Sequence, residues 1–210
     1  MTETTSATPV DPQDANALSP AGQRLLFTEA RTAYAFTAEP VSDDSLRAVY
    51  ELFKWAPTSA NINPLRVLFV RTPEGRERLL RGVPPTNQEQ TASAPVTAVL
   101  AVDTRYHEYV PVLAPETPNF KEILEGNDEL RTTHGSFNAT VQAGYFILAV
   151  RASGLAAGPM KGFDAAAIDK EFFDDGRWRS ILLVNIGHPA EGAFRERSPR
   201  PAYEQAVRLV

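Results

Sequence analysis

The side chains best suited to chemistry gather in one short segment, Pro57–Pro64, hereafter the polar loop, which follows a helical pattern and precedes an apolar run. It places two hydroxyls, Thr58 and Ser59, and two amides, Asn61 and Asn63, between its terminal prolines. Buried polar groups need hydrogen-bond partners, and this mixture of donors and acceptors suits a flat ligand whose ring edges carry both. A capped turn between a helix and a strand is the alternative. The loop by itself leaves both interpretations open.

Arginines near the two ends of the sequence form a second candidate site. Arg31 is followed by Thr32, and Arg195, Arg197 and Arg200 lie close together in the C-terminal part. Guanidinium groups bind phosphate oxygens through two parallel hydrogen bonds, which the point charge of a lysine cannot do. One arginine from each end would serve a phosphate monoester well. A solvated face or a set of surface ion pairs is the alternative.

A third candidate is the segment Gly158–Asp164, which has glycines at positions 158 and 162. Glycine lets the backbone approach a ligand closely. Backbone N–H groups outside regular structure would suit a planar ring nitrogen that takes up a proton with hydride. An ordinary turn between a helix and a strand explains the segment equally well.

The composition of the 210-residue chain excludes several classes of protein. A formal net charge of −5 argues against nucleic acid as the main partner, because phosphate backbones bind clustered cations. Without cysteine there is no thiolate catalyst, so redox chemistry would need a bound cofactor. No apolar run reaches the roughly 18 residues of a membrane span, and no export signal is evident. We expect a cytoplasmic protein without a membrane partner.

The signatures of other enzymes are missing from the sequence. There is no Gly-x-Gly-x-x-Gly or Walker-type loop. The three histidines, His107, His134 and His188, lack metal-ligand spacing, so no metal site is expected. We expect His134 to be a solvated or capping residue near the start of a helix, and Asp103 to cap the end of a strand.

Hydrophobic periodicity predicts one α+β domain over residues 19–210, after a flexible arm over residues 1–18. Apolar runs of strand length predict three strands, over Val67–Val70, Val96–Val102 and Ser180–Ile186. The second run is apolar almost throughout, so it should be buried on both faces. The segment Pro111–Asn127 has no clean period and is predicted to be an irregular excursion or flap over a site.

Apolar residues at helical spacing and suitable capping residues predict the helices. The shorter ones are a helix over Leu25–Thr32, one that Ser42 caps and Pro57 ends, one over Pro73–Arg81, and one after Asp164. A long helix marked by Phe137–Ala152 should end with Gly154 as its C′ residue. This helix has few polar side chains on any face, which is typical of a domain centre or a subunit interface.

Together these segments resemble the nitroreductase superfamily, and within it the malonic semialdehyde reductases of pyrimidine catabolism. The polar loop is similar to the Pro-Ser-Ser-x-Asn-x-Gln-Pro loop of the FMN oxidoreductases in that superfamily. The resemblance extends in the same order from Leu18 to Val210, and this colinearity makes it strong. It rests on Ala30–Thr32, Glu39–Asp43, Lys54–Asn61, Gly158–Asp164, Leu183–Gly187 and Arg197–Arg200.

The resemblance implies an α+β fold with a central, mostly antiparallel sheet flanked by helices, in an intertwined homodimer. It implies two FMN sites at the dimer interface, and FMN would carry the chemistry without a catalytic side chain. Hydride would pass from NADH or NADPH to FMN and then to a small-molecule acceptor, in ping-pong order. The branch implies a small 3-oxo acid or semialdehyde such as malonic semialdehyde as acceptor. A nitroaromatic or quinone reductase is one alternative, and a flavin-binding protein without turnover is another.

The resemblance also assigns residues to the FMN site. The phosphate would be held by Arg31, Thr32, Arg195 and Arg197, and Arg200 in place of Arg195 is left open. The ribityl chain and ring would be contacted by the partner subunit's copy of the polar loop, through Pro57, Thr58, Ser59 and Asn61, with Asn63 where many relatives have Gln. The flavin N5 would lie beside Pro159, Met160, Lys161 and Gly162, with a backbone N–H as donor.

Three further positions concern the ring. Asn87 matches an Asn that hydrogen-bonds the pyrimidine end of the flavin in relatives. Gln90 stands where relatives have Lys, and a neutral amide stabilises the negative charge of reduced flavin less well. We therefore expect a lower flavin reduction potential than in the relatives with Lys. Lys161 either attracts a carboxylate substrate or is a surface lysine whose stem packs on a ring edge.

Overall fold

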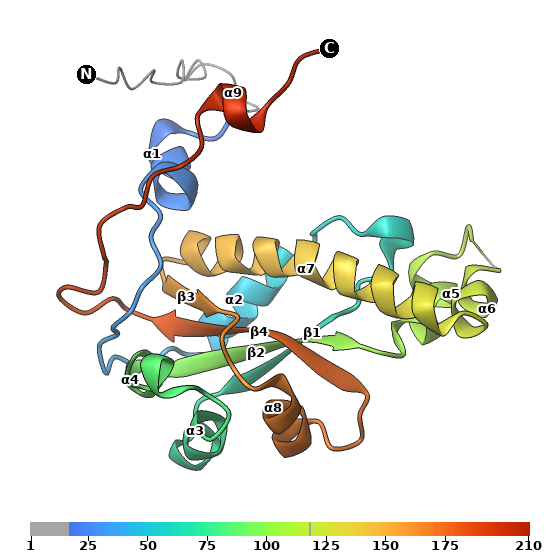
Figure 1. Cartoon of the computed structure of the whole chain (residues 1–210), viewed down its shortest axis with the longest axis horizontal. Helices are drawn as coiled ribbons and strands as arrows, with labels where there is room; N and C mark the ends of the chain where they lie inside the picture. Colours follow the sequence, from blue (N-terminus) through green and yellow to red (C-terminus); the bar gives the residue numbers. More distant parts are fainter. Residues whose placement is uncertain (1–16, 118) are drawn as a thin grey trace.

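The computed structural model describes residues 17–117 and 119–210. The flexible arm predicted over residues 1–18 falls outside this part except for its last two residues. A sheet forms the middle of the described part, with a long helix over one face and shorter helices against the other (Figure 1). None of the described helices combines the length and apolarity needed to cross a membrane.

The described residues form a four-stranded sheet in the order β1-β2-β4-β3, and every neighbouring pair is antiparallel. The strands are β1 (Leu65–Val70), β2 (Val96–Asp103), β3 (Ala156–Met160) and β4 (Trp178–Gly187). The three predicted strands are confirmed, each longer than its apolar run. Every residue of β2 is buried, as expected for an inner strand.

The segment around Gly158 belongs to strand β3, so the alternative of an ordinary turn over Gly158–Asp164 does not hold for its first three residues. Gly158 pairs with Asn185 of β4. Gly and Pro weaken strands, but proline is tolerated in an edge strand, and β3 is at the edge of the sheet. A Cβ at Gly158 would lie 2.6 Å from the carbonyl oxygen of Ala33. The missing side chain therefore admits a neighbouring chain segment and not a ligand.

Helices cover both faces of the sheet: α2 (Asp43–Phe53) and α7 (Asp128–Ala152) on one, α3 (Pro73–Leu80) and α8 (Ala165–Phe172) on the other (Figure 1). Alternate side chains of β2 divide the core between these layers. Leu100 and Val102 belong to the cluster with α2 and α7, whereas Val99 and Ala101 belong to the cluster with α3 and α8. The rigid platform that results positions the polar segments described below.

Three predicted helix ends are confirmed by their capping geometry. The Ser42 side chain accepts a hydrogen bond from the backbone N–H of Ser45, and the Asp164 side chain accepts one at the start of α8. Gly154 follows α7 with a φ of 78°, the left-handed conformation that favours glycine at this position. The helix that starts at Ser42 ends at Phe53, four residues before Pro57.

The long helix α7 begins nine residues earlier than the position of Phe137 indicates. Its first turns are polar and carry no apolar period, and Asn127 caps it through the backbone N–H of Leu130. His134 is only partly exposed and does not cap the helix, so its predicted capping role is wrong. Its ring lies edge-on to Phe120 at 5.6 Å, and burial lowers the pKa of His134.

The segment predicted to be an irregular flap is a packed helical unit. It contains most of α5 (Val110–Leu113) and all of α6 (Phe120–Glu125), and it follows directly after η3 (Tyr106–Tyr109). These short helices surround Tyr106, which is 1% exposed and whose pKa burial raises to about 12. The prediction failed because each helix is too short to show a hydrophobic period.

Both ends of the described chain project from the sheet as a pair of arms (Figure 1). The N-terminal arm holds α1 (Pro20–Gln23) and the π-helix η1 (Arg24–Thr28), so the helix predicted over Leu25–Thr32 begins and ends earlier. The C-terminal arm, residues 188–210, ends in α9 (Tyr203–Ala206) and is hereafter the tail. Large apolar side chains on both arms are exposed, among them Phe27 (57%) and Tyr203 (58%).

Candidate functional site

The arginines from the two ends of the sequence line one cavity of about 480 Å³, hereafter the arginine cavity. Its charged and polar lining includes Arg31, Thr32, Arg195, Arg197 and Arg200. The structure thus brings together the residues that the sequence indicated for a phosphate. Their binding of a cofactor stays a prediction.

Backbone pairing between the two arms explains this convergence. The N–H of Tyr34 donates to the carbonyl of Ala193 at 2.9 Å, and Ala33 forms an antiparallel bridge with Phe194. The Ala33 N–H also donates to Ala157 O of β3 at 3.1 Å. The two arms are therefore paired with each other and with the edge strand β3 at positions adjacent to Arg31 and Arg195 in the sequence.

The guanidinium groups of the arginine cavity contact carbonyls and a ring. Arg31 donates to the carbonyl of Arg195, and Arg197 donates to Thr28 O at 2.8 Å and to Ala30 O at 2.9 Å. The Arg195 guanidinium lies 3.9 Å from the centre of the Tyr34 ring. Among the described residues none of these three forms a salt bridge. Positive charge without acidic partners fits an anionic ligand.

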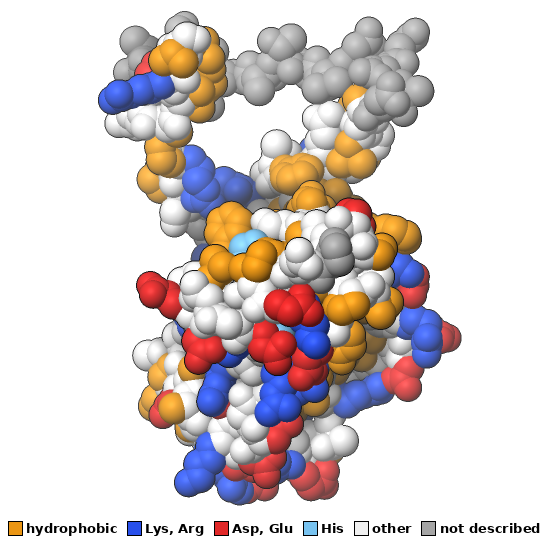
Figure 2. All heavy atoms as spheres, turned by 90° about the vertical axis from the view of Figure 1, so that its right-hand side faces the viewer, with side chains coloured by type: hydrophobic (Ala, Val, Ile, Leu, Met, Phe, Trp, Pro, Cys, Tyr) orange, Lys and Arg blue, Asp and Glu red, His pale blue; other side chains and the backbone are white. Residues whose placement is uncertain are grey.

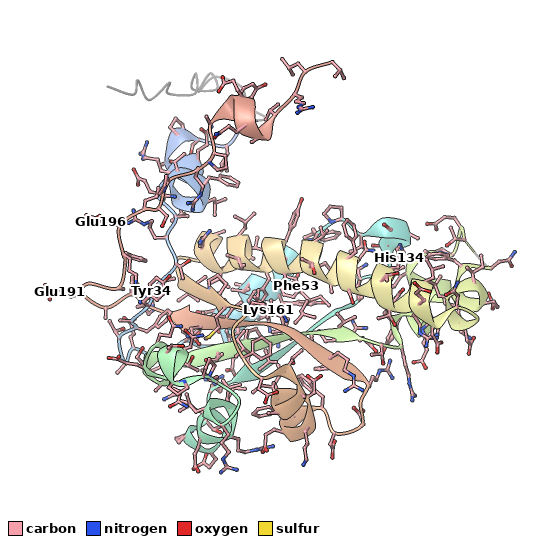
Figure 3. The ribbon with its side chains drawn as sticks, viewed as in Figure 1. Tyr34, Phe53, His134, Lys161, Glu191 and Glu196 are labelled. Atoms are coloured by element: carbon pink, nitrogen blue, oxygen red, sulfur yellow. The ribbon has the colours of Figure 1, made fainter. Side chains whose placement is uncertain are left out.

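One acidic residue, Glu196, lines the arginine cavity, and Figure 3 shows it on the outer side of the tail. One cationic residue of the lining, Arg151, was not found from the sequence. It lies in the last turn of α7, where a lone arginine gives no sequence signal of a site. The cavity therefore receives cations from both arms and from the helix that covers the sheet.

A second group, the amide cluster, consists of Asn87, Gln90, Met160 and Gly162. The Asn87 side chain donates to Gly162 O at 3.1 Å, and the Gln90 side chain donates to Asn87 Oδ1 at 2.9 Å. Gln90 Nε2 also lies 3.9 Å from Met160 Sδ. The structure thus joins residues assigned to the pyrimidine end of a flavin with the segment assigned to its N5.

Asn87 and Gln90 lie on α4 (Pro85–Ser93), a helix that the sequence analysis missed. A buried polar chain fixes α4 to the sheet. Thr91 donates to Asn87 O at 2.9 Å and accepts from the Asn185 amide at 3.3 Å. Thr97 in turn donates to Asn185 Oδ1 at 2.8 Å, and Asn185 is fully buried. Because they are buried, these hydrogen bonds are strong, and they fix the position of α4 and of the amide cluster that it carries.

Lys161 follows the last paired residue of β3 and is exposed. Its ammonium lies 5.3 Å from the centre of the Phe163 ring, and Figure 3 shows it over the middle of the sheet, far from His134. The exposure agrees with a surface lysine, and the role of Lys161 beside a flavin ring stays a prediction.

The polar loop has an unusual backbone. Ala60, Asn61 and Asn63 have φ values of 47°, 48° and 41°, in the left-handed region. Residues other than glycine adopt this conformation at a cost of about 1–2 kcal/mol each. Three such residues in one loop therefore require strong support from their surroundings.

Two buried amides of α7 give that support. The Asn138 side chain accepts from the backbone N–H of Ser59 at 2.8 Å. The Gln142 side chain accepts from Leu65 N–H at 2.9 Å and donates to Asn63 Oδ1 at 3.1 Å. Asn138 and Gln142 are 1% and 3% exposed. The sequence analysis missed both residues, because an amide on an apolar helix does not reveal its partner.

The side chains of the polar loop differ in their contacts. Asn63 donates to both Asn61 O and Asn61 Oδ1 at 2.7 Å, so its amide is engaged inside the loop. Asn61 donates to Leu113 O at 2.8 Å, and Thr58 Oγ1 accepts from Asn63 N–H at 3.3 Å. Ser59 and Pro57 are exposed. The loop surface thus exposes one hydroxyl, of Ser59, and the apolar ring of Pro57.

The polar loop and the arginine cavity lie on different parts of the described chain. In Figure 1 the turn η2 (Ser59–Asn61) is near α5, whereas the arms and α4 are at the opposite end of the sheet. Asn61 and Asn63 line a separate groove of about 950 Å³, which shares no lining residue with the arginine cavity. Within one subunit, therefore, the predicted site residues form two groups.

Asp103 is part of an ion-pair network and not only a strand-end cap. It is 1% exposed and lies 3.0 Å from both Arg66 and Arg177. It also accepts from Arg105 N–H at 2.9 Å, which is the predicted capping contact. The hydrogen bond from Arg177 to Asp103 raises the pKa of Arg177. These contacts give Asp103 a structural role.

Comparison with known proteins identifies relatives over most of the chain. Residues 28–188 match the model of the nitroreductase family. A Streptomyces coelicolor protein with the provisional name NADH dehydrogenase/NAD(P)H nitroreductase is 58% identical over 182 residues, which cover 87% of this chain and 90% of that protein. A Streptomyces griseus protein of the same name is 48% identical and covers 92% of this chain and 98% of its own length.

Solved structures share the fold. A nitroreductase-type protein from Exiguobacterium sibiricum, crystallised in complex with FMN, superimposes with a TM-score of 0.81 at 16% identity. The match covers 90% of this chain and 96% of that chain. The α+β fold with an antiparallel sheet flanked by helices, expected from the sequence, is thereby confirmed.

Proposed function

The chain belongs to the nitroreductase family, and from this premise we propose that it uses NADH or NADPH to reduce a small 3-oxo acid or semialdehyde, such as malonic semialdehyde. It is an FMN-dependent oxidoreductase. FMN, when bound, accepts hydride from the nicotinamide and delivers it to the acceptor. A cytoplasmic location belongs to the same proposal.

The arginine cavity is the observation that carries the assignment of the cofactor site. Arg31, Arg195 and Arg197 form no salt bridge among the described residues, and together they suit the phosphate of FMN. The amide cluster suits the pyrimidine edge, because Asn87 and Gln90 offer both donors and acceptors to ring atoms. The residues present therefore fit the cofactor at its two polar ends.

We propose that the protein is a homodimer in which each site is shared. The polar loop lies apart from the arginine cavity, so a second subunit is needed to add Ser59 and Pro57 to the site. Large side chains support an interface: Trp55, Phe137 and Tyr145 are 77%, 67% and 42% exposed. Figure 2 shows hydrophobic side chains gathered below the arms. Analytical ultracentrifugation should give the mass of a dimer, and a monomer would contradict the shared site.

The choice of acceptor rests on the resemblance to one branch and on Lys161, an exposed cation that could attract a carboxylate. A nitroaromatic or quinone reductase is the second candidate, because the relatives carry nitroreductase names. NAD(P)H oxidation should be followed with malonic semialdehyde, a nitroaromatic and a quinone. The proposal expects the largest kcat/KM for malonic semialdehyde. A larger value for either flat acceptor would overturn the substrate assignment, and reduction of none of them would favour a binding protein without turnover.

A further inference from the structure

Arg151 differs from the other cations of the arginine cavity in its origin. It belongs to the last turn of α7, whereas Arg31 and Arg197 belong to the two arms. The side chains of Arg31 and Arg197 donate to backbone carbonyls, but the side chain of Arg151 has no hydrogen bond or salt bridge within the described part of the chain. A half-buried guanidinium with five donors is thus left for a ligand.

Two features of its surroundings oppose the positive charge of Arg151, although the C-terminal end of α7 favours a cation. Burial lowers the pKa of Arg151, and the positive charge of Arg197 lowers it further. The C-terminal end of a helix also carries partial negative charge, which repels an anion. A cation in the last turn of α7 cancels this repulsion and makes the cavity acceptable to a dianion.

We propose that Arg151 is a phosphate-binding residue that makes the site selective for a flavin carrying a dianionic phosphate monoester. This inference rests on the proposed function. Arg151 adds a cation from α7 to those that the arms contribute to the cavity. A phosphate monoester carries between one and a half and two negative charges at neutral pH. Riboflavin has the same ring and ribityl chain without this group, so it does not use Arg151.

The test compares flavin binding by the full-length apoprotein and by variants, using quenching of flavin fluorescence. Arg151→Met should weaken FMN binding about 10- to 100-fold, the effect of losing one charge-assisted interaction. Riboflavin binding should change less than about twofold. Arg151→Lys keeps the charge but not the fork, so its effect on FMN should be intermediate. Arg81→Met is the matched control, because Arg81 is exposed just after the end of α3 and pairs with Glu77 outside the cavity.

Thermal unfolding of the apoproteins gives an independent readout. Removal of an unpaired half-buried cation should leave the melting temperature of Arg151→Met unchanged or raise it, although FMN binding falls. Unchanged FMN binding would overturn the inference. So would equal weakening of FMN and riboflavin, or a large fall in melting temperature, because each indicates a structural role. A wild-type protein that binds neither flavin would instead refute the proposed function.

Discussion

The arginine cavity and the polar loop are both rich in hydrogen-bonding groups, but the structure supports them in opposite ways. The polar loop finds its hydrogen-bond partners inside its own subunit. Asn138 and Gln142 of α7 supply buried partners to this segment, whose backbone has three left-handed residues. The arginine cavity differs, because Arg151 and the neighbouring arginines form no salt bridge among the described residues, and the one acidic residue of the lining, Glu196, lies on the outer side of the tail. The hydrogen-bonded polar loop therefore presents a fixed surface, whereas the cations of the arginine cavity are left to bind an anionic ligand.

Removal of one arginine from each arm should have the largest effect, a loss of FMN affinity. It tests whether the arginine cavity binds an anionic ligand. The double variant Arg31→Met, Arg197→Met should lower FMN affinity about a thousand-fold, because two charge-assisted interactions are lost. Isothermal titration of the apoprotein measures the change. Arg81→Met is again the control. A loss smaller than about tenfold would mean that the phosphate lies elsewhere.

Loss of a buried amide of α7 should have the next largest effect. It tests whether the polar loop depends on hydrogen bonds from within its own subunit. Gln142→Leu removes the partners of Leu65 N–H and Asn63 Oδ1, and should lower the free energy of unfolding by about 2–3 kcal/mol. Thr140→Ala on the exposed side of α7 should cost less than about 0.5 kcal/mol. Urea denaturation measures both. Equal effects would show that the loop does not depend on the buried amide.

The amide cluster lies between the two extremes, since its groups bond to one another and are also the ones that we propose for the flavin ring. Gln90→Lys should raise the two-electron reduction potential of bound FMN by about 30 mV, which corresponds to about 1.4 kcal/mol. Gln90→Glu should lower it. Potentiometric titration of the FMN-loaded proteins measures both shifts. Equal potentials in all three proteins would remove Gln90 from the flavin site.

The smallest expected effect concerns the backbone strain of the polar loop. Ala60 has a φ of 47°, so Ala60→Gly should stabilise the protein by about 0.5–1 kcal/mol, because glycine adopts this conformation without strain. Ala149→Gly in the interior of α7 should destabilise it by a similar amount. Thermal unfolding of the two variants should therefore show shifts of opposite sign, and a fall in both would mean that Ala60 is not strained.

The sequence predicted elements wherever burial follows a period. β2 is apolar throughout, and α2 has apolar residues at helical spacing behind a serine cap, so both were predicted. β3 was missed because Ala, Gly and Pro form a strand there only through pairing with β4. α4 was missed because Thr91 is its one buried residue.

The site was predictable to the extent that residue type reveals chemistry. The arginines and the amides of the polar loop were recognised from their types and their resemblance to a family. Arg151, Asn138 and Gln142 were not, because their roles depend on which segments pack against α7. The residues adjacent to a side chain in the sequence do not indicate which distant segment it will contact in the fold.

The most direct test of the central claim is an anaerobic titration of the purified, FMN-reconstituted protein with NADH and with NADPH. The account predicts a yellow protein whose visible flavin absorbance bleaches stoichiometrically with at least one of the two nucleotides and returns when an acceptor is added. A protein that cannot be loaded with FMN, or one that stays yellow with both nucleotides, would contradict it.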